Sequence, residues 1–417
     1  MSAIDDNPRR SGWLNACVSE FRCIGPECEE SCCGGWQITM DEPALVALSS
    51  LNDPRVQALL TNHLRRFDTC STPTQMGWLQ LRPDGSCPFL EPERLCAIQA
   101  RHGEDPMPLG CKVYPRVHHR IDGEVHSSLS LSCPEAARRV LCASDESARP
   151  ALEAVLEETL ASLPEAATAT EIFWLWQGFH EAILRARKWL MADRMVVIGS
   201  LARSLDARHD GNAAAALREV CQVLLGQVDQ KKLPAAASGT IAPEALEFLL
   251  AAMNSGLGFA GQNQRFRELT ARVLRGLAYR PDCRPGMDLL PRCQKLRNEV
   301  LEPVLNAHPQ WMENYLCNEL IRGLYPLGTP TADRHRTIEH GQTHAEDAFA
   351  GLSLQWAWIR LYWIGVAGDS AFDLEAAALC VQSLTRAVFA RSAEFAALCQ
   401  AWKRLMQILP LEKLLSL

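Results

Sequence analysis

The stretch Cys23-Ile-Gly-Pro-Glu-Cys28-Glu-Glu-Ser-Cys32-Cys33-Gly-Gly-Trp36 decides how the front of this chain folds. Four cysteines fall within eleven residues, and the turn formers Gly and Pro lie between and after them. Short loops of this kind let several sulfur atoms converge on one small volume, and thiolates are the soft ligands of iron–sulfur clusters and zinc. We therefore expect a loop-rich, metal-binding fold with little regular structure around these residues.

Four more cysteines recur downstream in compact, turn-rich settings, and the full candidate ligand set is Cys23, Cys28, Cys32, Cys33, Cys87, Cys96, Cys111 and Cys133. Structural zinc usually shows paired knuckles with two to four residues between the cysteines, whereas the gaps here are four, three and none. We favour an iron–sulfur cluster, with zinc and unliganded buried thiols as the alternatives. Eight thiols exceed the four that one cluster needs, so either some are neighbours of the ligands or a second site exists.

Cysteine usage and the N-terminal sequence indicate the compartment. Eleven of the 17 cysteines lie in the first 142 residues, and no apolar run near the N-terminus is long enough for a signal-peptide core. Reduced thiols are therefore expected, together with a cytoplasmic location. The apolar stretch 352–366 is too short to span a bilayer, so no membrane association is expected. A net charge of −7 argues against a general nucleic-acid binder, which needs a basic surface.

The spacing of apolar residues divides the chain of 417 residues into two predicted domains. Residues 1–145 form the cysteine-rich domain, with short helices, little strand and one small hairpin around 120–125. Residues 146–417 are rich in Ala and Leu at helical spacing, and we expect a larger all-helical domain that completes the cofactor and substrate cleft. The fold class is therefore mainly α.

Two common cofactor motifs are missing. Cys28-x3-Cys32 begins like the C-x3-C-x2-C motif of radical S-adenosylmethionine enzymes, but Gly35 occupies the position of the third cysteine. The sequence also lacks a strand–Gly-loop–helix unit: Gly256-x-Gly258-x-x-Gly261 has the G-x-G-x-x-G spacing but follows the helix expected over 242–253 and not a strand, so a Rossmann-type methyl-donor site is unsupported.

The cysteine motifs carry a family resemblance. The stretches 21–38, 87–90, 95–96, 110–116 and 131–138 resemble the flagellin lysine N-methylases and, more distantly, bacterial cysteine-cluster domains described as zinc- or iron-chelating. A weaker likeness extends to 313–326 in the second domain. The resemblance implies a protein lysine N-methyltransferase that uses S-adenosylmethionine, carries a 4Fe-4S cluster and modifies surface lysines of flagellin.

Lysine methylation sets a chemical requirement of its own. A lysine amine is protonated near neutral pH and must lose that proton before it attacks a methyl sulfonium, so a base or a desolvated pocket is needed. We assign Tyr114, Glu135 and Glu313 as candidate catalytic residues, with Trp36 and Arg116 as candidate cofactor contacts. Further candidates near the same motifs are Glu29, Glu30, Asn314 and Tyr315.

Two other functions remain open from the residues alone. One is an iron–sulfur oxidoreductase in which the cluster passes electrons and no methyl group moves. The other is a metal-binding module, without enzymatic activity, that docks a partner protein. Histidines outside the motifs, namely His118, His119, His335, His340 and His344, are interpreted mainly as solvated surface groups.

Overall fold

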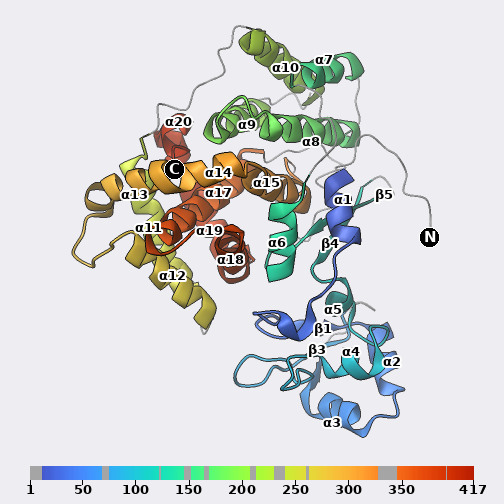
Figure 1. Cartoon of the computed structure of the whole chain (residues 1–417). Helices are drawn as coiled ribbons and strands as arrows, with labels where there is room; N and C mark the ends of the chain where they lie inside the picture. Colours follow the sequence, from blue (N-terminus) through green and yellow to red (C-terminus); the bar gives the residue numbers. More distant parts are fainter. Residues whose placement is uncertain are drawn as a thin grey trace. The chain divides into compact units, whose positions relative to one another are not determined.

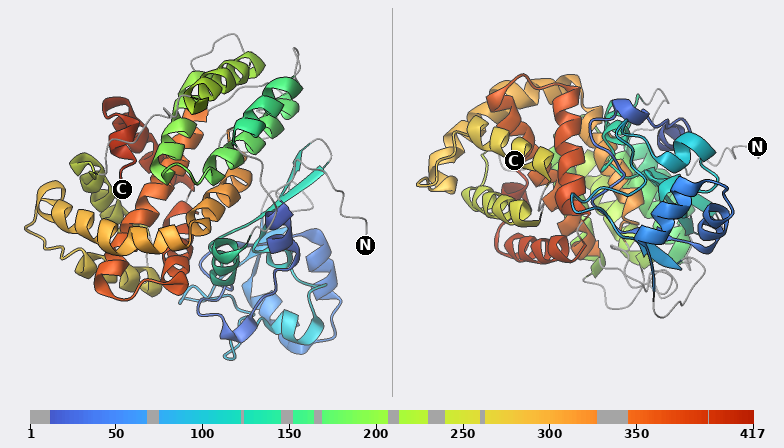
Figure 2. Two further views of the ribbon diagram at one scale, coloured as in Figure 1. Left: turned by 45° about the horizontal axis from the view of Figure 1, so that its top comes forward. Right: turned by 90° about the horizontal axis from the view of Figure 1, so that it is seen from below.

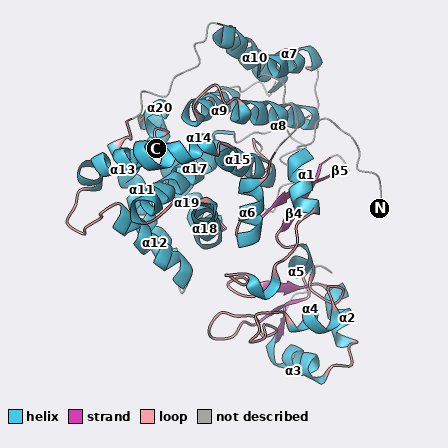
Figure 3. Ribbon diagram, in the orientation of Figure 1, coloured by secondary structure: helices cyan, strands magenta, loops and turns pink. Residues whose placement is uncertain are grey.

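Helices dominate the computed structural model, which describes residues 12–67, 75–121, 124–144, 152–163, 169–206, 213–229, 240–259, 263–326, 345–390 and 392–417. Strands appear only in short pieces of the first 129 residues within these ranges (Figure 3). The predicted mainly α class is confirmed.

The described chain groups into two compact units. The cysteine unit comprises Phe21–Val117 and Cys133–Ala136, and the helical unit comprises the described parts of Met1–Glu20, His118–Ser132 and Ala137–Leu417. These units differ from the predicted division at residue 145, because the chain leaves the cysteine unit at residue 117 and returns to it only for four residues. The two-domain division of the sequence stays a prediction.

The cysteine unit is built from short elements joined by turns. They are η1 (Gly25–Glu27), β1 (Ile38–Met40), α2 (Glu42–Ser49), α3 (Pro54–His63), β2 (Leu64–Arg66), β3 (Gly77–Leu79), α4 (Ala97–His102) and α5 (Leu109–Val113). Asp41 and Asp53 start α2 and α3, since each carboxylate accepts hydrogen bonds from main-chain N–H groups of the first turn. A proline follows each cap in the first turn, where its missing N–H costs nothing.

A three-stranded antiparallel sheet holds the core of this unit. The strand order is β1-β3-β2, and Leu79 of β3 is paired with Ile38 on one side and Leu64 on the other. Gly77 is required in β3, because a Cβ atom there would lie 2.4 Å from the carbonyl oxygen of Arg65. Ile38, Met40 and Leu79 are buried in the core that lies behind the cysteine loops.

The front of the helical unit contains one antiparallel hairpin, β4 (Arg116–Ile121) with β5 (Glu124–Leu129), which packs against α1 (Gly12–Ser19) and is followed in the sequence by α6 (Pro134–Cys142). The hairpin predicted around residues 120–125 is thereby confirmed.

The rest of the helical unit is a large helical assembly (Figure 1). Its elements are α7 (Leu152–Ser162), α8 (Ala169–Arg185), α9 (Met191–Asp206), α10 (Ala213–Asp229), α11 (Pro243–Phe259), α12 (Gln264–Gly276), η2 (Pro285–Leu289), α13 (Leu290–Leu296), η3 (Arg297–Leu301), α14 (Glu302–Ala307), α15 (Gln310–Arg322), α17 (Ala345–Asp369), α18 (Leu374–Leu384), η4 (Thr385–Phe389), α19 (Ser392–Ile408) and α20 (Leu411–Leu414).

Helix α17 forms the centre of this assembly, where it packs against α9, α12, α18 and α19 (Figure 2). Its side chains Trp356, Trp358 and Trp363 are fully buried, which explains why its apolar residues surround the helix instead of forming one stripe. Asp206 at the end of α9 caps α17 by accepting from the N–H groups of Ala345 and Glu346. Among the described helices, none is both long enough and apolar enough to span a membrane.

Candidate functional site: a cavity lined by eight cysteines

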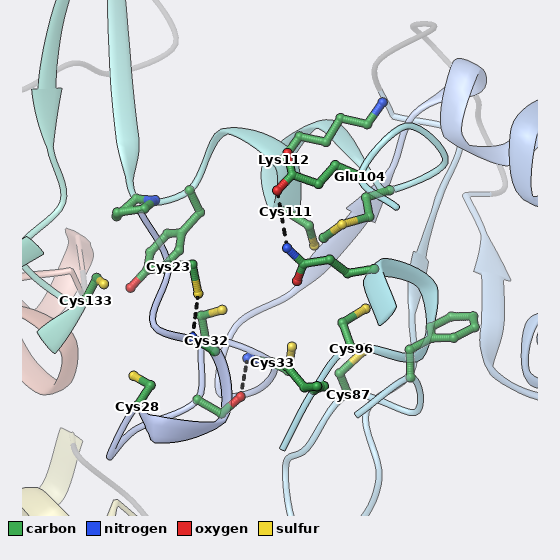
Figure 4. A pocket seen from close by; sticks show the side chains of 18 of the residues that line it. Cys23, Cys28, Cys32, Cys33, Cys87, Cys96, Glu104, Cys111, Lys112 and Cys133 are labelled. Carbon is green, nitrogen blue, oxygen red and sulfur yellow. Dashed lines mark hydrogen bonds between the residues drawn. The ribbon is translucent and has the colours of Figure 1, made fainter. Parts of the chain in front are cut away.

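The cysteine unit encloses a cavity of about 410 Å³ whose wall includes every cysteine of the predicted ligand set (Figure 4). These residues come from segments up to 110 positions apart in the sequence, and they are Cys23, Cys28, Cys32, Cys33, Cys87, Cys96, Cys111 and Cys133. The structure therefore brings together the thiols that the sequence singled out.

Glycines make the cysteine loops possible. Gly25, between Cys23 and Cys28, has a φ of +60°, a conformation that side chains with a Cβ atom rarely adopt. Gly34 follows the double cysteine, and a Cβ atom there would lie 2.7 Å from the carbonyl oxygen of Gly85. This close approach lets the Cys33 carbonyl accept a hydrogen bond from Cys87 N at 2.9 Å. The Gly residues of the motif thus join two cysteine loops.

Main-chain and side-chain hydrogen bonds hold the remaining loops. The N–H of Gly25 donates to Cys23 Sγ at 3.4 Å, and the indole N–H of Trp36 donates to the Cys32 carbonyl at 2.8 Å. The guanidinium of Arg94 donates to the Cys28 carbonyl. These contacts hold the main chain at Cys28 and Cys32 and orient the thiol of Cys23.

Burial governs the protonation of the thiols. It raises the pKa of Cys87 to about 11 and that of Cys133 to about 12. Hydrogen bonds with the thiols of Cys32 and Cys96 raise the pKa of Cys33, and the same contact with Cys33 lowers the pKa of Cys96. A metal that binds here must displace protons from most of these thiols.

The thiols surround the cavity instead of meeting at one point. Among the described residues, no group of three or more His, Cys, Asp or Glu side chains is arranged to hold a single metal ion. A four-iron cluster has a different requirement, because each of its irons takes one thiolate from a different side. Eight thiols on the wall of a cavity this large fit a cluster better than a lone zinc ion.

The cavity also has charged and aromatic walls. Basic side chains come from Arg22, Arg94, Lys112 and Arg116, and carboxylates come from Glu30 and Glu104. The guanidinium of Arg116 lies 5.3 Å from the centre of the Phe21 ring and donates to the Phe21 carbonyl at 3.0 Å. The basic side chains offset the negative charge that several thiolates would bring into the cavity.

Three of the predicted catalytic and cofactor residues line this cavity, namely Tyr114, Trp36 and Arg116. Trp36 is 37% exposed and packs 3.4 Å from the position that a Cβ atom of Gly110 would occupy. Glu135 lies in the first turn of α6 and is not among the described residues of the cavity wall. Glu30 belongs to the wall, whereas Glu29 does not.

Glu313 lies in the helical unit, where it is completely buried. Its carboxylate accepts from Arg187 at 2.8 Å and from Arg194 at 3.0 Å, and Arg185 lies 3.6 Å away. These ion pairs occupy both carboxylate oxygens with side chains of the same unit. This geometry indicates a structural role for Glu313.

The other predicted residues of the helical unit also make structural contacts. Asn314 donates to the Val140 carbonyl at 2.9 Å, and the hydroxyl of Tyr315 donates to Gln355 at 2.8 Å. His118 contacts Ser127, and His119 contacts the Arg322 carbonyl. The cluster His335, His340 and His344 lies outside the described residues.

Sequence reasoning missed several residues of the cavity wall. Glu104 and Arg94 line it but lie in no recognised motif, whereas Arg22 lies in the stretch 21–38 but was not among the candidate site residues. Glu104 accepts a hydrogen bond at 3.3 Å from Gln99, which also lines the cavity. Arg94 has a φ of +64°, a backbone conformation that its residue type does not predict.

Comparisons with known proteins place the chain in a family. Residues 179–417 match the family described as FliB lysine N-methylase C-terminal domain. The chain is 33% identical over 127 residues to the lysine-N-methylases of Salmonella typhimurium strain LT2 and Salmonella choleraesuis, and this match covers 30% of the chain and 31% of each relative.

It is also 32% identical over 127 residues to the flagellar biosynthetic protein FliU of Salmonella muenchen, covering 74% of that protein. No solved structure matches the chain. The family match extends over more than half of this sequence and covers most of the helical unit. The chain therefore belongs to the FliB lysine N-methylase family.

Proposed function

We propose that this protein is a protein lysine N-methyltransferase, which uses S-adenosylmethionine to methylate surface lysines of flagellin and holds a 4Fe-4S cluster in its cysteine unit. Family membership is the observation that carries the methyl-transfer part of the proposal. The names of the relatives, a lysine-N-methylase and a flagellar biosynthetic protein, support lysine as the acceptor and a flagellar target.

The cavity of the cysteine unit supports the cluster and the site of chemistry. Its eight thiols supply the ligands, and its basic side chains offset their charge. When bound, a 4Fe-4S cluster supplies one-electron chemistry and a rigid hub for the loops that carry its thiolates. The cluster ligands would come from this cysteine set.

The aromatic and acidic side chains suit the two other participants. The exposed indole of Trp36 offers a π-face to a positively charged sulfonium or ammonium group. Glu104 and Glu30 offer carboxylates that attract the ammonium of an incoming lysine. Glu104 is solvent-exposed and is oriented by Gln99, so a lysine on the surface of a protein substrate can reach it.

Methyl transfer then requires one proton transfer and one displacement. The lysine ammonium gives its proton to the Glu104 carboxylate, and the freed nitrogen lone pair attacks the methyl carbon of the sulfonium. The new N–C bond forms as the C–S bond breaks, and its electron pair stays on sulfur as a neutral thioether. Tyr114, on the same wall, orients the amine by hydrogen bonding.

Purified flagellin, isotopically labelled S-adenosylmethionine and the anaerobically prepared protein test this proposal, with methylated lysines counted by mass spectrometry. We expect labelled methyl groups on flagellin with the wild type, and a loss of kcat by a factor of about 100 or more with Glu104→Gln. Glu93→Gln removes an exposed carboxylate of the same unit that does not line the cavity, and it should leave the rate unchanged.

Absence of label on flagellin with cluster-loaded wild type would contradict the proposed function. Equal rates for Glu104→Gln and Glu93→Gln would contradict the role of Glu104 while leaving the function in place.

A further inference from the structure

Lysine is rare in this chain, and one lysine lies on the wall of the cysteine cavity. The sequence contains seven lysines, and Lys112 is the only one among its first 187 residues. The other basic side chains of the described wall are the arginines Arg22, Arg94 and Arg116. A guanidinium stays protonated in proteins, whereas an ammonium can lose a proton and become a nucleophile. Lys112 is therefore the one amine among the described wall residues that can accept a methyl group.

Hydrogen bonds fix the main chain of Lys112 at this wall. Lys112 belongs to α5, where its N–H donates to the Pro108 carbonyl at 3.0 Å. The N–H of Leu109, at the start of the same helix, donates to Asp41 Oδ2 at 2.7 Å. The preceding residue, Cys111, lines the cavity as well. The backbone of Lys112 is therefore held beside the thiols, and rotation of its side chain is enough to move the ammonium.

The side chain of Lys112 is exposed, and it forms no ion pair with a carboxylate of the described residues. Lys403 in the helical unit differs, because its ammonium lies 2.7 Å from Asp347. In Figure 4 the Lys112 side chain extends away from the cysteines. Exposed side chains change rotamer within nanoseconds, so the ammonium is free to turn from solvent towards the cavity.

A carboxylate of the same wall can receive the proton of this ammonium. Glu104 lies eight residues before Lys112 in the sequence, and both side chains line the cavity (Figure 4). A turn, closed by the Met107 N–H donating to the Glu104 carbonyl at 3.0 Å, joins Glu104 to the segment that leads into α5. Glu104 is exposed, so an exposed ammonium that turns towards the cavity is attracted to its carboxylate.

From these observations we infer that Lys112 is itself a methylation site, modified within its own chain. The inference rests on the proposed function, which supplies S-adenosylmethionine as the methyl donor. The Lys112 ammonium gives its proton to the Glu104 carboxylate, and the freed nitrogen lone pair attacks the methyl carbon of the sulfonium. The new N–C bond forms as the C–S bond breaks, and the electron pair of that bond stays on sulfur. Methylated Lys112 keeps its positive charge, so the wall stays basic.

Mass spectrometry of the chain itself tests the inference. Fragments of the protein as isolated are first searched for methyl groups already present on Lys112. The anaerobically prepared full chain is then incubated with isotopically labelled S-adenosylmethionine, once alone and once with flagellin, and the label is located on fragments of both proteins. Lys112→Arg removes the acceptor and keeps the positive charge. Lys295→Arg is the matched control, because Lys295 is an exposed lysine of the helical unit.

We expect label on Lys112 at about 10-fold or more above that on Lys188 and Lys295 in the same sample, because an acceptor held at the wall needs no encounter with a second molecule. For the same reason, the rate of labelling per chain should stay constant when the protein is diluted. Lys112→Arg should lose this label and Lys295→Arg should keep it. The position of the label in the wild type decides the question even if Lys112→Arg folds poorly.

Labelled flagellin together with an unmodified Lys112 would overturn the inference and leave the proposed function in place. Equal label on Lys112, Lys188 and Lys295 would overturn it as well, and so would a labelling rate per chain that rises in proportion to the protein concentration. Label on Lys112 without label on flagellin would support the inference and remove flagellin as the substrate. Absence of label from both proteins would contradict methyl transfer itself, and the inference with it.

Discussion

The side-chain amide of Asn318 makes both main-chain hydrogen bonds of Leu129. Asn318 Oδ1 accepts from Leu129 N at 3.0 Å, and Asn318 Nδ2 donates to the Leu129 carbonyl at 2.9 Å. Both residues are completely buried. A side chain of α15 thus takes the place of a neighbouring strand at the end of β5, where no water is available to pair these backbone groups.

Replacement of Asn318 should therefore be costly. Asn318→Ala leaves a buried N–H and a buried C=O without partners, and we expect it to lower the free energy of unfolding by about 2–5 kcal/mol. Asn306→Ala removes an amide at an exposed position and should change stability by at most about 0.5 kcal/mol. Urea unfolding followed by circular dichroism measures both. Equal changes in the free energy of unfolding for the two variants would contradict the pairing of Asn318 with Leu129.

Loss of the Glu313 carboxylate should destabilise the helical unit more than loss of its exposed partner. The side chains of Arg185 and Arg194 are 4% and 6% exposed, and Glu313→Gln removes the carboxylate that both guanidinium groups share, so that Arg185 keeps only the more distant Glu181 at 3.9 Å. We expect a loss of about 3–5 kcal/mol. Arg187 is 52% exposed, so Arg187→Ala should cost at most about 1 kcal/mol.

Thermal and urea unfolding compare the two variants, and methyl transfer per folded molecule should be unchanged in Glu313→Gln. A well-folded but inactive Glu313→Gln would instead return this residue to the candidate catalytic groups.

Close contact between α12 and α17 makes Gly276 intolerant of a side chain. A Cβ atom at Gly276 would lie 1.8 Å from the carbonyl oxygen of Gly365, so backbone must move to admit it. We expect Gly276→Ala to cost about 3 kcal/mol or more. Gly226 in α10 has open space around its Cβ position, and Gly226→Ala should stabilise the protein by about 0.5–1 kcal/mol. Urea unfolding should show a lower free energy of unfolding for Gly276→Ala and a higher one for Gly226→Ala. Equal destabilisation of the two variants would contradict this prediction.

Acid should weaken the helical unit through His180. Burial lowers the pKa of His180 to about 4, and its Nδ1–H donates to the Trp176 carbonyl at 2.6 Å. An unfolded histidine binds its proton near pH 6.5. Between pH 6.5 and pH 4 this imidazole is therefore protonated in the unfolded state and neutral in the folded state. The free energy of unfolding should fall by about 3 kcal/mol as the pH drops through this window.

His180→Phe has no titrating group at this position. Its urea-unfolding free energy, measured at intervals from pH 7.5 to pH 4, should fall less than that of the wild type. Parallel pH profiles for the two proteins would show that His180 does not cause the acid sensitivity.

Local patterns predicted the parts of the fold that depend on neighbouring residues. Helical spacing predicted the helices after residue 150, turn residues predicted the hairpin of β4 and β5, and the Gly-rich cysteine motifs predicted which thiols share one cavity. These features arise from backbone preferences and from burial within short segments.

Such local patterns could not predict contacts between segments that are far apart in the sequence. Glu313 looked like a possible base because its sequence does not reveal that Arg187 and Arg194, more than 100 residues earlier, surround it. Glu104 lies in no motif, and its place in the wall beside the cysteines is known only from the fold. The motif at Cys133 predicted its place beside the other thiols, but not that residues 118–132 belong to the helical unit, so that the chain returns to the cysteine unit only at Cys133–Ala136.

Because Cys133 returns to the cysteine unit from far along the sequence, a metal bound to it and to an early cysteine would cross-link the chain. A centre held by both Cys32 and Cys133 would close a loop of about 100 residues, and closing such a loop with a covalent bridge removes about 4–5 kcal/mol of chain entropy from the unfolded state. The folding free energy of the segment between those two cysteines would then depend on how much metal is bound. Stabilities of variants, including those in the hairpin, are comparable only between samples with the same metal content.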